Sequence, residues 1–114
     1  MNFSGVIPIL ITPFKEDGSV DYNSIKKIIN FMNTLPLSGI TLLGVLGESA
    51  RLSDVEKRNI IDFVSTLDNS LPVIYGVNSY SPYVSEELAN YAQDKHASAV
   101  MLSPIKENSA ILKK

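Results

Sequence analysis

The chain has 114 residues, of which 45% are hydrophobic and 19% are charged, a composition typical of one globular domain with a buried core. Twelve acidic and ten basic residues give a formal charge of −2, and no basic cluster is longer than a pair, which argues against a nucleic-acid partner. Because there is no cysteine and only one histidine, His96, we expect no disulfide, no metal and no other cofactor.

The first apolar stretch, residues 5–12, predicts a strand. Its sequence, GVIPILIT, is continuously apolar, as in a strand that a parallel sheet buries on both faces, although Pro8 cannot donate a hydrogen bond to a ladder. No positive residues precede it as they would in a signal peptide, and Pro8 and Pro13 interrupt it. We therefore expect no membrane span and a cytoplasmic protein.

An amphipathic helix is predicted next, with Asp21 as its N-cap. Its apolar stripe has helical spacing and consists of Ile25, Ile28, Ile29, Met32 and Leu35. Pro36 and Gly39 end this helix, and residues 40–44, ITLLG, predict a second buried strand.

A second helix is predicted from Ser53 and Glu56, which have the spacing of a capping box. Its apolar residues continue to about residue 68. Residues 72–77, PVIYGV, then predict the third strand.

The last predicted helix begins with Ser81 as N-cap and Pro82 in the first turn, and it precedes a fourth strand at residues 98–103. The order is βαβαβαβ, with a strand about every 31 residues, as in the N-terminal half of a TIM (β/α)8 barrel. A doubly wound α/β sheet has the same spacing. In both folds the loops that follow the parallel strands meet on one face, where we expect functional groups.

The turn after the second strand, GVLGES, is the most distinctive of these loops. Gly44 and Gly47 allow left-handed backbone conformations, so the N–H groups around Val45 and Leu46 can form a concavity that binds a small anion such as a carboxylate. The alternative is a tight strand-to-helix turn with Glu48 solvated or capping a neighbour. The turn lacks the Lys-Ser/Thr of a phosphate-binding loop and the GxGxxG spacing of a dinucleotide site.

Two single residues are further candidates for a functional role. His96 falls in the last turn of its helix, where a surface or capping role is expected. Lys106 follows the fourth strand and is a candidate amine nucleophile, although a solvated loop lysine is the favoured interpretation. The other seven lysines are assigned to loops, helix surfaces or the tail.

Five segments, in this order and spacing, resemble the N-terminal half of the dihydrodipicolinate synthase / N-acetylneuraminate lyase family. They are GVIPILITPF, DYNSIKKIINF, GITLLGVLGESARLSDVEK, PVIYGVNSYS and AVMLSPIKEN, and they cover the chain to about residue 108. The most specific parts are T-P-F at residues 12–14 and G-x-x-G-E at residues 44–48, followed by Leu52.

The resemblance implies that residues 1–114 form a partial (β/α)8 barrel of a lyase that binds pyruvate or another 2-keto acid as a Schiff base. The residues that it implies for binding the substrate carboxylate share the glycine turn: Gly44, Val45, Leu46 and Gly47. Thr12 and Glu48 would support that turn. The family's Schiff-base lysine lies on a later strand, so we expect no catalytic residue in this chain, which would act as a homo-oligomer or with a complementary half-barrel.

Two departures from the family pattern bear on the reaction. Many members have two hydroxyl residues where this chain has Val45 and Leu46, and a tyrosine pair where it has Ile105 and Lys106. Both differences are more similar to the 2-keto-3-deoxy-sugar-acid dehydratase or hydratase-aldolase branches than to authentic dihydrodipicolinate synthase. The competing hypothesis is a noncatalytic half-barrel that assembles with a partner or binds a small carboxylic acid.

Overall fold

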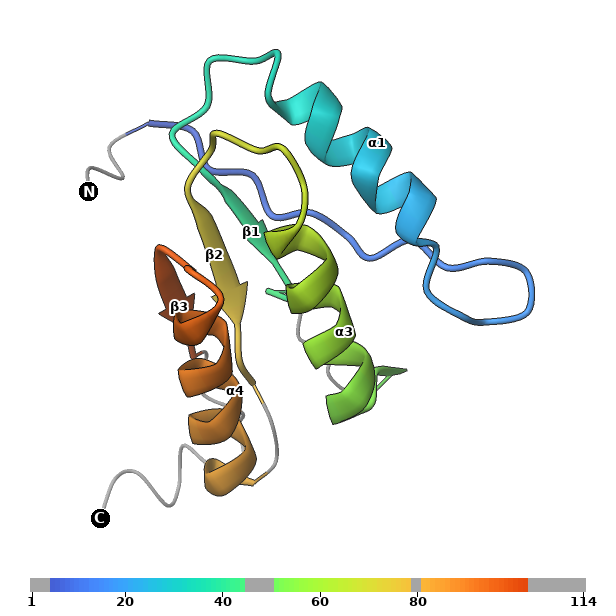
Figure 1. Cartoon of the computed structure of the whole chain (residues 1–114), viewed down its shortest axis with the longest axis vertical. Helices are drawn as coiled ribbons and strands as arrows, with labels where there is room; N and C mark the ends of the chain where they lie inside the picture. The colour runs from blue at the N-terminus through green and yellow to red at the C-terminus, as the bar shows by residue number, and fades with distance from the viewer. Residues whose placement is uncertain (1–4, 45–50, 79–80, 103–114) are drawn as a thin grey trace.

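The computed structural model describes residues 5–44, 51–78 and 81–102, and the elements within them alternate between helices and strands. In chain order they are α1 (Tyr22–Met32), β1 (Ile40–Leu42), α3 (Asp54–Ser65), β2 (Val73–Gly76), α4 (Pro82–Asp94) and β3 (Ala99–Met101) (Figure 1). The strands form a parallel sheet in the order β1-β2-β3, with Ile40 opposite Val73 and Ile74 opposite Ala99.

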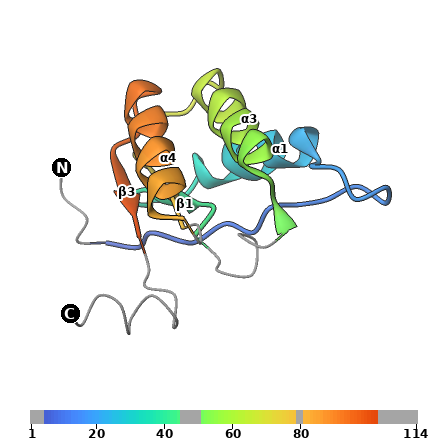
Figure 2. The same ribbon diagram turned by 90° about the horizontal axis from the view of Figure 1, so that it is seen from below.

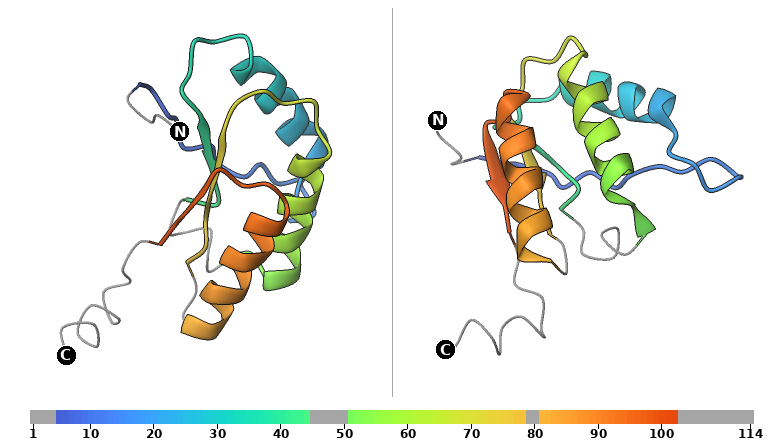
Figure 3. Two further views of the ribbon diagram at one scale, coloured as in Figure 1. Left: turned by 60° about the vertical axis from the view of Figure 1, so that its left-hand side comes forward. Right: turned by 60° about the horizontal axis from the view of Figure 1, so that its bottom comes forward.

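Helices α1, α3 and α4 all cover the same face of this sheet, as Figures 2 and 3 show. Between the helices and the sheet lies one apolar core, whose most buried members include Ile25, Ile29, Ile40, Ile60, Ile61 and Ala92. A doubly wound sheet would have helices on both faces. The one-sided arrangement therefore confirms the predicted arc of a (β/α)8 barrel with parallel strands.

The N-terminal segment lies beside β1 but makes only one ladder bridge, between Ile9 and Thr41. Leu10 N donates to Thr41 O at 2.8 Å, and Thr41 N donates to Pro8 O at 2.9 Å. The ladder stops on one side because Pro8 has no N–H, and on the other because Leu43 leaves the extended conformation with a φ of 61°. The strand predicted over residues 5–12 is thus an extended segment with a single bridge, and β1 ends at Leu42 instead of residue 44.

The helix starts are confirmed as predicted. At the start of α1, Asp21 accepts a hydrogen bond from Ser24 N at 3.1 Å. At the start of α3 the capping box is complete: Ser53 Oγ accepts from Glu56 N, and Glu56 Oε1 accepts from Ser53 N. Ser81 caps α4, with proline in the first turn. These side-chain oxygens bind N–H groups that have no partner within the helix.

Asn33 ends α1 four residues after the buried Ile29, so the helix stops before Leu35. The Asn33 side chain donates to Ile29 O and to Asn69 Oδ1, both at 2.8 Å. Its Oδ1 accepts from the backbone N and the Oγ of Ser70, both at 3.0 Å. One amide side chain thereby joins the end of α1 to the loop between α3 and β2.

Candidate functional site

The carboxyl ends of β1 and β2 meet through backbone atoms. A Cβ added to Gly76 would lie against the carbonyl oxygen of Leu43, 2.8 Å from its carbonyl carbon and 2.9 Å from Gly44 Cα. Leu43 itself holds a left-handed φ of 61°, which is rare for a residue with a branched side chain. Only glycine at position 76 lets the chain leave β1 along this path.

Gly44, the first residue of the predicted turn, is also closely packed. A Cβ there would lie 2.9 Å from Thr41 Cγ2, 3.1 Å from Met101 Cε and 3.4 Å from Ile9 Cγ2. These side chains come from the N-terminal segment, from β1 and from β3, which lies beyond β2 in the sheet. The turn therefore begins directly over the sheet face that the helices leave uncovered.

Of the six residues predicted for the turn site, Gly44 and Thr12 belong to the part of the chain that the structure describes. Thr12 is buried, with 3% of its surface exposed, in the segment that continues from the bridge at Ile9. The remaining four predictions, together with Lys106, lie outside the described residues: Val45, Leu46, Gly47 and Glu48.

The T-P-F segment contacts a residue that follows the glycine turn in the chain. The guanidinium carbon of Arg51 is 4.4 Å from the centre of the Phe14 ring, a cation–π contact. Phe14 also bridges to Val20 across a short turn. The T-P-F segment and the residues that follow the glycine turn are thus joined at the same end of the sheet.

Lys57 corrects one prediction of the sequence analysis, which assigned it to an exposed surface. Its side chain is 4% exposed, and its Nζ donates to the carbonyl oxygen of Asn78 at 3.2 Å, just beyond the end of β2. Burial lowers the pKa of the Lys57 ammonium, and the charge of Asp54 opposes this shift. The sequence contained the signal, because Lys57 precedes Ile60 and Ile61 by three and four residues and so lies on the apolar stripe of α3.

His96 lies one residue beyond the C-cap of α4, not in the last turn where the sequence placed it, and it takes part in the cap through its backbone. It adopts a left-handed φ of 67° after α4, its N–H donates to Gln93 O, and the next N–H, of Ala97, donates to Ala92 O. These two bonds form a Schellman motif, in which the left-handed position is usually glycine. His96 is therefore far from the glycine turn, at the amino ends of the strands.

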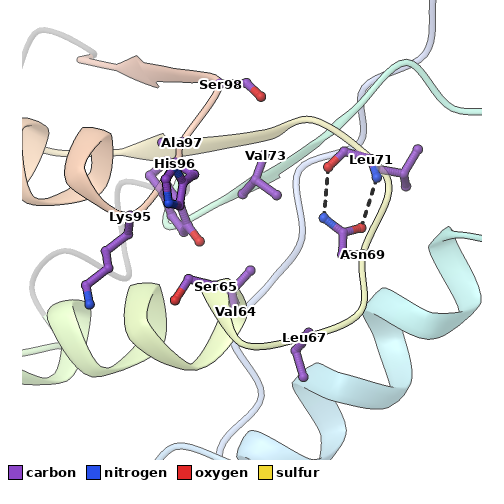
Figure 4. Close-up of a pocket in the computed structure, with 11 residues that line it drawn as sticks. Val64, Ser65, Leu67, Asn69, Leu71, Val73, Lys95, His96, Ala97 and Ser98 are labelled. Carbon is purple, nitrogen blue, oxygen red and sulfur yellow. Dashed lines mark hydrogen bonds between the residues drawn. The ribbon is translucent and has the colours of Figure 1, made fainter.

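The part of the chain that the structure describes holds no group of three or more His, Asp or Glu side chains that could bind a metal ion. Within the same residues, every helix is too short or too polar to cross a membrane. The cavity drawn in Figure 4 lies at the amino ends of β2 and β3, not at the glycine turn. The described site therefore consists of backbone and side chains at the carboxyl ends of the strands, with the Lys57 ammonium buried behind them.

Comparison with known proteins identifies the family. The sequence profile of the dihydrodipicolinate synthetase family matches residues 2–104. The chain belongs to this family. The resemblance in the sequence is thereby confirmed over nearly the whole chain.

Relatives within the dihydrodipicolinate synthetase family match the chain over part of their length. A 4-hydroxy-tetrahydrodipicolinate synthase of Methanothrix thermoacetophila is 35% identical over 100 residues, which are 88% of this chain and 34% of the relative. The chain spans about a third of the length of the curated relatives it matches.

Solved structures of the same family agree with the fold. A dihydrodipicolinate synthase from Rhodopseudomonas palustris has a TM-score of 0.81 and 32% identity, covering 88% of this chain and 33% of that one. A 2-keto 3-deoxygluconate aldolase from Picrophilus torridus has a TM-score of 0.82 and 26% identity, covering 90% and 37%. The chain is thus similar both to a synthase and to a sugar-acid aldolase.

Proposed function

We propose that this chain forms the N-terminal half of the barrel of a Schiff-base lyase that acts on pyruvate or another 2-keto acid. The lyase class is supported by family membership and by the synthases and aldolase to which the chain is similar. The observation that carries the proposal is the backbone packing of Leu43, Gly44 and Gly76. This packing lies where the glycine turn begins, at the carboxyl end of a barrel strand. TIM-barrel enzymes bind their substrates on the face formed by these strand ends.

In this proposal the substrate carboxylate accepts hydrogen bonds from backbone N–H groups of residues 44–47, a site that needs no charged side chain. Val45 and Leu46 add apolar surface, while Thr12 and Glu48 support the turn. A lysine from a later strand of the barrel attacks the keto carbon and expels water to give an iminium. The iminium withdraws electrons from the neighbouring carbon, which favours either bond formation or cleavage there.

Borohydride trapping tests this proposal. The chain would be mixed with pyruvate and sodium borohydride, alone and together with the part of the Methanothrix thermoacetophila relative that follows its matched region. We expect no adduct on the chain alone, and a single adduct on a lysine of the complementary segment when both are present. An adduct on Lys106 or Lys57 of the isolated chain, or no adduct in the mixture, would contradict the proposal.

A pair of glycine variants tests the role of the turn in the same assay. Gly44→Ala places a Cβ 2.9 Å from Thr41 Cγ2 and should reduce adduct formation, because the turn must shift. Gly18→Ala is the matched control, since a Cβ there meets no atom within 4 Å and Gly18 lies in a different loop. Equal adduct yields from the two variants would exclude a substrate-binding role for the Gly44 turn.

A second candidate function, assembly without catalysis, is favoured by the uncovered sheet face. Leu10 points into the core, and its neighbours Ile9 and Ile11 are 52% and 71% exposed. Val6 and Leu102 are exposed as well. Apolar side chains on an open sheet promote association. We therefore expect the chain to associate in solution, and a stable monomer by light scattering at micromolar concentration would contradict this.

A further inference from the structure

A cavity of about 160 Å³ lies between the ends of α3 and α4 and the segments that enter β2 and β3 (Figure 4). Its apolar lining comes from Val64, Leu67, Leu71, Val73 and Ala97, and its polar lining includes Ser65, Asn69, Lys95, His96 and Ser98. A cavity of roughly 150 Å³ holds one six-membered hydrocarbon ring. The space is therefore large enough for a small organic molecule, at the opposite end of the strands from the glycine turn.

The hydroxyl of Tyr75 gives this cavity a specific polar group. Tyr75 lines the cavity and is 2% exposed, and its hydroxyl makes no hydrogen bond to any residue within 5–44, 51–78 or 81–102. Because Tyr75 lines the cavity, its hydroxyl is open to a molecule that enters it. Burial and the charge of Asp62 raise the pKa of Tyr75 far above its ordinary value, so the group remains a neutral donor. An acceptor atom in the cavity would satisfy it.

The charges around the cavity offset one another. Lys95 Nζ lies 3.4 Å from Asp62 Oδ1, and the same carboxylate oxygen accepts from the Tyr91 hydroxyl at 2.6 Å. Helices α3 and α4 both end at the cavity, and their last carbonyl groups carry partial negative charge. Neither an anion nor a cation would therefore find an unbalanced partner.

We propose that this cavity binds a small uncharged molecule that has an apolar body and one hydrogen-bond acceptor, such as a cyclic or short-chain ketone. The acceptor binds the hydroxyl of Tyr75, and the body contacts the side chains of Val64, Val73 and Ala97. The site is separate from the glycine turn and does not depend on the reaction proposed for it.

Titration of the ¹⁵N-labelled full chain with cyclohexanone, followed by amide chemical shifts, tests the proposal. We expect saturable shifts concentrated at Val73, Ala97 and Ser98. Tyr75→Phe, which removes one hydrogen bond and keeps the ring, should bind about tenfold more weakly. Tyr83→Phe is the matched control, because Tyr83 is 79% exposed near the start of α4 and does not line the cavity, so its affinity should equal that of the wild type.

Two further comparisons complete the test. Ala97→Leu fills the cavity and should abolish the saturable shifts, and this variant decides the question if Tyr75→Phe does not fold. Cyclohexanecarboxylate and cyclohexylammonium have the same ring with a charge, and both should bind more weakly than the ketone. Non-saturating shifts, equal affinity of wild type and Tyr75→Phe, or tighter binding of a charged ring would overturn the proposal.

Discussion

Replacing Gly76 by alanine tests whether the contact between β1 and β2 determines the path of the chain. The added methyl group would lie against the carbonyl oxygen of Leu43, 2.8 Å from its carbonyl carbon and 2.9 Å from Gly44 Cα. All three are backbone atoms, which cannot rotate away as the end of a flexible side chain can. Relief therefore requires the end of β1 to move away from β2.

The size of the effect follows from that rigidity. Overpacking a core costs about 1 to 3 kcal/mol, and the upper end applies where no side chain can yield, so we expect Gly76→Ala to lower the unfolding free energy by about 3 kcal/mol. A chain of this length has a total stability of roughly 6 to 17 kcal/mol, so the loss is a large fraction of it. Gly18→Ala, with a φ of 89° and no atom within 4 Å of the new Cβ, should lose only about 1 kcal/mol from its backbone conformation.

Urea unfolding followed by circular dichroism would measure both variants against the wild type. The reasoning requires Gly76→Ala to lose about 2 kcal/mol more than Gly18→Ala, with little change in the slope against urea. If the two alanine variants lost the same amount, the steric contact with Leu43 would not be what positions the turn.

Three other predictions concern single side chains. Burial lowers the pKa of Lys57 below its ordinary value of 10.5, so the folded chain releases this proton at a lower pH than the unfolded chain does. The stability of the wild type relative to Lys57→Met should therefore rise as pH increases toward 10.5. A stability difference that falls with pH in urea titrations would contradict this. His96→Gly removes a side chain from a left-handed position and should stabilise the chain by about 1 kcal/mol, measured in thermal melts. A lower melting temperature would show that contacts of the imidazole ring stabilise the fold by more than the backbone strain destabilises it. Ser53→Ala should cost about 1 kcal/mol through loss of the cap, and Ser53→Thr, which keeps the hydroxyl, should restore most of it; equal losses would exclude the capping box as the cause.

Local features of the fold could be read from the sequence, because their physical causes are local. Asp21, Ser53 and Ser81 cap helices through N–H groups three residues away, so short motifs sufficed to place them. The repeat length did not separate a barrel from a doubly wound sheet, because the covered face depends on how the helices pack in three dimensions. The family resemblance favoured the barrel over the doubly wound sheet, and the structure confirmed the barrel.

Features that depend on contacts between distant segments could not be predicted from the sequence. Leu43 was predicted to continue a strand, but it turns left-handed where its carbonyl passes over Gly76, more than thirty residues later. Lys57 was assigned to a surface by residue type, although its position on the helical stripe indicated burial. The cavity beside Tyr75 depends on where α3 and α4 end relative to each other, which no short motif records.

The bonds made by Asn33 have a consequence for how such a barrel can be modified. Its side chain links the first helix to Asn69 and Ser70 in the next unit, at the amino end of the sheet. Because this joint lies at the opposite end of the sheet from Gly44, a substitution at Gly44 leaves its hydrogen bonds in place. A designer who recombines half-barrels should therefore keep residues 33 and 69–70 within the same fragment.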